Sequence, residues 1–82
     1  MRYTVTWHPW AEDELARLWL GAPDPQAVTA VADRIDTALS VDPEGQGDEY
    51  YGDRLLVVLP LAVIFAVHPD DRGVEVLQAW HR

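Results

Sequence analysis

Three residues in the second half of the chain, Arg54, His81 and Arg82, have side chains suited to chemistry on a phosphate. A histidine can transfer protons near neutral pH, and an arginine can hold a phosphate or stabilise developing charge. Arg54 follows an irregular segment and precedes an apolar run, where a side chain can project over one end of a sheet. If the three converge, they form a candidate phosphodiester site. The alternative, which composition favours, is that Arg54 pairs with nearby acids and that the last two residues are frayed.

The other polar residues give weaker candidates. His8 and Glu12 could share a metal, but Pro9 puts them across a strand-to-helix junction instead of on one helical face. The acids Glu12–Glu14 are consecutive in a predicted helix, so they do not converge, and they complement the helix dipole. The tryptophans Trp7 and Trp19 fall at core-facing positions. We therefore expect no metal and no cofactor.

A strand and two helices are predicted for the first half of the chain. Between Arg2 and His8, apolar residues alternate with threonine in the period-2 pattern of a strand. Pro9 suits the first turn of a helix, which Gly21–Pro23 ends. The pair Asp24–Pro25 starts the next helix, since aspartate accepts from free N–H groups and proline has none to lose. The apolar stripe of this helix comprises Val28, Val31, Ala32, Ile35, Ala38 and Leu39.

The second half of the chain predicts a loop followed by three strands. The segment from Asp42 to Asp53 combines acids with glycine and proline, so we expect a loop there. The apolar runs Leu55–Leu59 and Leu61–Val67 are rich in β-branched residues, and Pro60 between them marks a hairpin turn. A last strand follows from Val74. The expected fold is α+β in the order βααβββ, with the helices packed on an antiparallel meander of three strands, in one domain over residues 1–82.

Composition narrows the function classes. The net charge of the 82 residues is −8, with six Arg, no Lys and fourteen Asp plus Glu, so the chain repels phosphate backbones at long range. Cysteine is absent, which excludes disulfides and thiolate chemistry and makes a reducing cytoplasm the expected location. The N-terminus does not read as a signal peptide, and no apolar run reaches the roughly 20 residues of a membrane helix. We expect no membrane association.

Segments along nearly the whole chain carry a resemblance through their order and spacing. They are Tyr3–Trp7, Ala11–Leu15, Ala32–Ile35, Asp42–Gly45, Gly52–Leu55, Leu61–Val67 and Val76–Arg82. Together they resemble the RelE/ParE superfamily of bacterial toxins, also called plasmid-stabilisation proteins. The resemblance implies a βααβββ fold, a toxin of a type II toxin–antitoxin module, and an antitoxin partner with a helical or extended segment that wraps the toxin. The implied activity is cleavage of messenger RNA at the ribosome in the RelE-like branch and inhibition of DNA gyrase in the ParE-like branch.

The resemblance also assigns roles to individual residues. Arg54 matches the basic position that opens the second strand of RelE-like nucleases, and His81 matches a near-terminal histidine that some use as general acid or base. Arg82 falls where several have a tyrosine or another basic residue, and Glu49 is a further candidate for the base. The arginine that the nucleases carry just before the next apolar run is replaced by Ala62. Such a loss commonly lowers the rate ~10²-fold or more.

The sequence thus leaves three hypotheses about function. The first is a toxin that binds a protein target, for example DNA gyrase, and is neutralised by a cognate antitoxin. The second is a weak ribosome-dependent endoribonuclease that uses Arg54, His81 and Arg82. The third is an inactivated relative that serves as a binding subunit. The sequence does not determine the oligomeric state.

Overall fold

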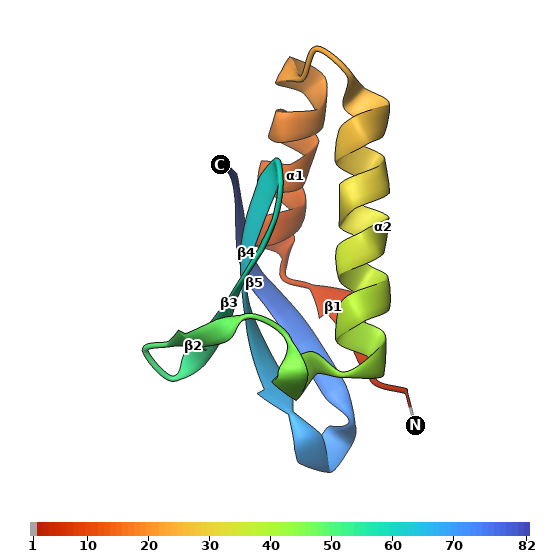
Figure 1. Cartoon of the computed structure of the whole chain (residues 1–82). Helices are drawn as coiled ribbons and strands as arrows, with labels where there is room; N and C mark the ends of the chain where they lie inside the picture. Colours follow the sequence, from red (N-terminus) through yellow and green to blue (C-terminus); the bar gives the residue numbers. More distant parts are fainter. Residues whose placement is uncertain (1) are drawn as a thin grey trace.

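Two helices pack on one face of a mixed sheet in the computed structural model, which describes residues 2–82 (Figure 1). The helices are α1 (Pro9–Gly21) and α2 (Pro25–Val41), with short 3-10 helices η1 (Pro43–Gly45) and η2 (Pro69–Asp71). The strands are β1 (Thr4–Trp7), β2 (Asp48–Tyr50), β3 (Asp53–Val58), β4 (Leu61–His68) and β5 (Gly73–His81). This arrangement confirms the predicted α+β class.

The sheet of the described residues has five strands in the order β1-β5-β4-β3-β2. The first strand, β1, pairs in parallel with β5, and all the other neighbours pair antiparallel. The predicted succession of a strand, two helices and an antiparallel meander is therefore confirmed. The predicted number of strands is wrong by one, because β2 forms within the segment that we expected to be a loop.

Backbone geometry explains the extra strand. The side chain of Asp42 accepts a hydrogen bond from the N–H of Gly45 at 3.2 Å, which closes the η1 turn. Gly47 then takes a positive φ of 65°, and Tyr51 and Gly52 have φ of 50° and 89°. Positive φ at both residues of a two-residue loop is typical of a type I′ hairpin turn, which matches the twist of paired strands. Pairing with β3 thus overrides the low strand propensity of this acidic segment.

Helix starts follow the sequence signals in part. Pro9 and Pro25 each occupy the first turn of a helix, as predicted. Asp24 stands at the N-cap of α2, but its side chain makes no capping hydrogen bond, contrary to expectation. The imidazole of His8 caps α1 instead, since its Nδ1 accepts from the N–H of Trp10 at 3.1 Å. His8 is thereby accounted for as a structural residue.

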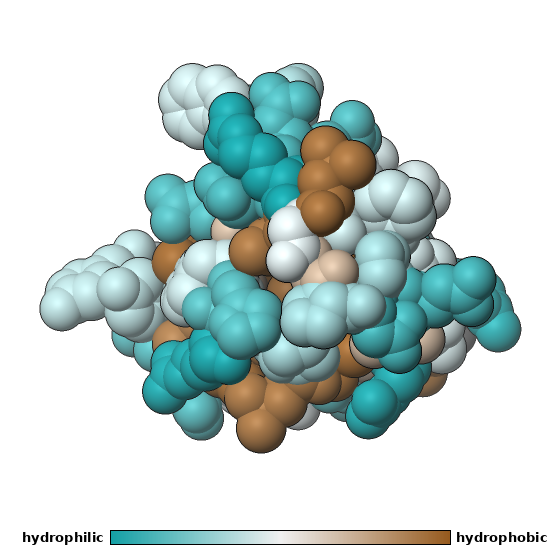
Figure 2. Space-filling view, turned by 90° about the horizontal axis from the view of Figure 1, so that it is seen from above, coloured by the Kyte–Doolittle hydropathy of each residue, from teal (hydrophilic) through white to brown (hydrophobic). Residues whose placement is uncertain are grey.

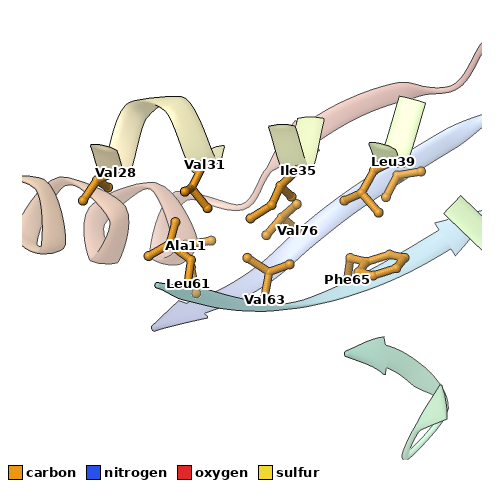
Figure 3. Close-up of a cluster of buried hydrophobic side chains, with 11 residues drawn as sticks. Ala11, Val28, Val31, Ile35, Leu39, Leu61, Val63, Phe65 and Val76 are labelled. Carbon is orange, nitrogen blue, oxygen red and sulfur yellow. The ribbon is translucent and has the colours of Figure 1, made fainter. Parts of the chain in front are cut away.

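The core lies between the helices and the central strands (Figure 3). Most of its fully buried side chains come from α2, β4 and β5, and they include Ile35, Leu39, Leu61, Val63, Phe65 and Val76; Ala11 adds one from α1. Each such side chain stabilises the fold by roughly 1.5–3 kcal/mol relative to an exposed position. Trp7 packs against this core as predicted. The prediction is wrong for Trp19, because its side chain stays 43% exposed and its indole reaches across to α2.

The opposite face of the sheet is not covered by the helices. Along β4 the core residues Leu61, Val63 and Phe65 alternate with Ala62, Ile64 and Ala66, so the second set points to the other face. Ala62 is nevertheless 0% exposed, and its cross-strand neighbours are Val57 and Trp80.

No helix within residues 2–82 is long and apolar enough to cross a membrane.

Candidate functional site

Arg54 lies near the start of β3 and turns its guanidinium toward the segment before β2. Its Nε donates a hydrogen bond to the carbonyl oxygen of Gln46 at 2.9 Å, and its Nη2 donates to the carbonyl oxygen of Gly47, also at 2.9 Å. Hydrogen bonds from a charged donor are among the stronger ones in proteins. Arg54 therefore holds the chain in place between η1 and β2.

The cleft around Arg54 is acidic. It has a volume of about 250 Å³ and is lined by Glu44, Glu49 and Asp53 together with Arg54. Glu49 is the residue opposite Arg54 in the β2–β3 ladder, so the candidate base does lie beside the candidate arginine. Three carboxylates against one guanidinium, two of whose N–H groups are already donated, give a surface that disfavours a phosphate.

His81 lies at the other end of the sheet. It is the last residue of β5 and lines a cleft of about 410 Å³ together with Arg17, Asp24 and Pro60. This cleft opens between the turn that joins the helices and the turn that joins β3 to β4. The next residue, Arg82, donates its backbone N–H to the carbonyl oxygen of Pro60 at 2.7 Å, so the backbone there is paired and not frayed.

The sheet register keeps Arg54 and His81 apart. Arg54 is paired with Phe65, and His81 is paired with Leu61 on the opposite side of the same strand. Phe65 and Leu61 are four residues apart along β4, which corresponds to about 13 Å. The condition for a shared phosphodiester site, convergence of the three predicted residues, is not met in this structure.

Ala62 does not face either candidate. It points to the uncovered side of the sheet, whereas its neighbours Leu61 and Val63 contact the core on the helix side. Arg54 and His81 are paired with residues that face the helices, so they share the helix side. An arginine at position 62 would therefore point away from both.

A groove that the sequence analysis did not identify runs between α1 and α2. Its volume is about 430 Å³, and its apolar lining includes Leu15, Ala16, Val28 and Ala32. The indoles of Trp7 and Trp19 line it as well, together with three acids. The small residues Ala16 and Ala32, one on each helix, are visible in the sequence. That they lie close together depends on how the helices pack.

The described residues offer no cluster of His, Asp and Glu that could hold a metal ion. They form one ion pair, between Arg17 and Glu14 on α1 at 3.4 Å, and its exposed side chains contribute little to stability.

Two solved structures share this architecture. One is a chain of the RelBE2 toxin–antitoxin complex from Mycobacterium tuberculosis, with a TM-score of 0.81, 20% sequence identity, and coverage of 100% of this chain and 93% of that chain. The other is a chain of the chromosomal ParDE toxin–antitoxin system from P. aeruginosa, with a TM-score of 0.76, 19% identity, and coverage of 96% and 95%. The sequence matches no protein-family model and no curated protein. The chain therefore has a RelE/ParE-like fold over its whole length.

Proposed function

We propose that the chain is the toxin of a type II toxin–antitoxin module that acts in the cytoplasm by binding a protein target. The observation that carries the proposal is the whole-length match to chains of two toxin–antitoxin structures, one named RelBE2 and the other ParDE. The cognate antitoxin is then the partner that neutralises it. DNA gyrase, the target that the resemblance to the ParE-like branch implies, is the first candidate for the cellular target.

The surface chemistry supports binding over RNA cleavage. Arg54 donates two N–H groups to main-chain carbonyls and is surrounded by acids, and His81 lies at the far end of the sheet. The net charge of −8 also opposes an approach to ribosomal RNA. A nuclease would need a cationic cradle for the scissile phosphate, and these residues do not provide one.

Expression in a bacterial host tests this proposal. The chain alone should arrest growth, and co-expression of the reading frame beside its gene should restore growth and yield a stable complex. Primer extension on translated messages should show intact RNA during the arrest, and purified chain should inhibit supercoiling by DNA gyrase. Cleaved messages would instead support the endoribonuclease hypothesis. Harmless expression, with no binding by the neighbouring protein, would contradict the toxin assignment altogether.

A further inference from the structure

Two tryptophans line the groove between α1 and α2, and each donates a hydrogen bond to a residue of α2. The indole N–H of Trp7 donates to Oδ1 of Asp36 at 2.8 Å, and the indole N–H of Trp19 donates to Oγ1 of Thr29 at 3.1 Å. Thr29 and Asp36 are seven residues apart on α2, a rise of about 10.5 Å, or two helical turns. Both indoles are thus fixed against α2, and the groove between these positions is long enough for a short helix.

The floor and the rim of the groove differ in character. Val28 and Ala32 are buried in the floor, whereas Glu12 on α1 and Asp33 on α2 are exposed at the rim, as is Asp36. No lysine, arginine or histidine lines this groove. An occupant therefore has to bring apolar side chains for the floor and positive charge for the rim.

We infer that this groove is the docking site for a basic amphipathic helix of the antitoxin. The inference rests on the proposed function, and charge complementarity identifies the occupant: a helix with leucine-type residues on one face and Lys or Arg beside them. Two turns of such a helix match the length between the tryptophans. The net charge of −8 also favours the approach of a basic segment over an acidic one.

The apolar surface elsewhere is less suited to this occupant. The end of the molecule that carries the α1–α2 and β3–β4 turns exposes apolar side chains among polar ones (Figure 2), including Leu20 at 76% and Leu59 at 68%. The cleft at that end is lined by Arg17 as well as by Asp24, so it does not offer a basic helix a rim made only of acids. The α1–α2 groove combines an apolar floor with a rim of acids, so it is the better fit for a cation-bearing helix.

Binding of two synthetic peptides to the full chain tests the docking site. Both are 18-residue amphipathic helices with the same leucine face; one carries lysines beside that face and the other carries glutamates. The lysine peptide should bind and change the tryptophan fluorescence, and its affinity should fall as the salt concentration is raised. The glutamate peptide should not bind. Equal binding of both peptides, or of neither, would overturn the inference.

Two matched pairs of variants locate the site. In the Glu12→Lys/Asp33→Lys variant, the affinity for the lysine peptide should fall about tenfold or more. The control variant Asp70→Lys/Asp71→Lys makes the same change in net charge at η2, and its affinity should fall less. Ala16→Phe fills the groove and should abolish binding, whereas Ala30→Phe, at an exposed α2 position outside the groove, should not. Circular dichroism of each variant is the check that it is folded. If the two variants of either pair lost affinity for the lysine peptide equally, the location of the docking site would be wrong.

The same variants separate this inference from the proposed function. If the protein encoded beside the gene neutralises the chain but binds the Ala16→Phe variant equally well, the groove assignment is wrong and the toxin assignment stands. If the lysine peptide binds as described but expression of the chain is harmless and the neighbour does not bind, the toxin assignment is wrong and the groove is a site for another basic partner.

Discussion

At one end of the sheet Arg54 lies against main-chain carbonyl oxygens that accept two of its N–H groups, whereas at the other end His81 is an exposed residue that lines an open cleft. Both belong to residue types that often do chemistry, and both stand at an end of a strand. The first is part of the architecture, because its donors are used to hold the chain between η1 and β2. The second remains available to solvent and to a partner.

This difference indicates how residue type can mislead in a small domain. A guanidinium with five N–H donors is a common solution for a loop with unpaired carbonyls, as well as for a phosphate. The structural use of Arg54 leaves the surface of the chain to be dominated by carboxylates. Recognition of a partner then depends on grooves and charge more than on a catalytic centre.

The largest effect that sharpens this comparison is expected at Gly47. The carbonyl of Gly47 accepts from Arg54, its φ is 65°, and a Cβ there would overlap the carbonyl of Leu55. Gly47→Ala should lower the free energy of unfolding by about 3 kcal/mol, measured by urea denaturation. Gly52→Ala is the matched control, since Gly52 has a positive φ but open space around it, and should cost about 1 kcal/mol. Equal losses of unfolding free energy in the two variants would contradict the close packing of Gly47 against Leu55.

The next effect separates the two faces of the sheet. Ala62→Arg should lower the free energy of unfolding by about 2 kcal/mol, because the position is fully buried between Val57 and Trp80. The variant should not cleave messages in a primer-extension assay, since the new side chain lies on the face opposite Arg54. Ala66→Arg, on the same face and half-buried, should cost less. A gain of RNA cleavage by Ala62→Arg would instead support the third hypothesis, that the chain is an inactivated relative of the nucleases.

Removal of the Arg54 hydrogen bonds gives a smaller effect. Arg54→Met should lower the free energy of unfolding by about 1.5 kcal/mol and increase hydrogen exchange in β2, because two carbonyls lose their donor. Arg54→Lys should recover less than half, since an ammonium lacks the fork geometry. The control Arg34→Met, at an exposed position on α2, should stay within about 0.5 kcal/mol. An Arg54→Met variant as stable as the parent would contradict the structural role.

The smallest expected effect is at His81. His81→Ala should change the free energy of unfolding by less than about 0.5 kcal/mol, because the residue is exposed, and growth arrest on expression should persist. The measurement is growth after induction, with protein levels checked by immunoblot. Loss of growth arrest at an unchanged protein level would show that His81 is required for toxicity, so the end of the sheet that carries it would be functional.

The sequence by itself determined the elements that depend on local pattern and composition. The period of the apolar residues set β1 and α2, the prolines marked the helix starts and the β3–β4 turn, and the acidic composition determined the charge of the surface. These features depend on residues that are close in the chain, so their physical causes can be read from neighbouring letters.

Only the tertiary structure decided how distant residues meet. The strand β2 depends on pairing with β3, and the separation of Arg54 from His81 depends on the register of three strands. The groove between the helices depends on Trp7 and Trp19 reaching across to α2 from different elements. Pairing register and side-chain packing between distant segments are cooperative properties of the folded chain. Local propensity therefore identified the candidate residues but not the places to which they are brought.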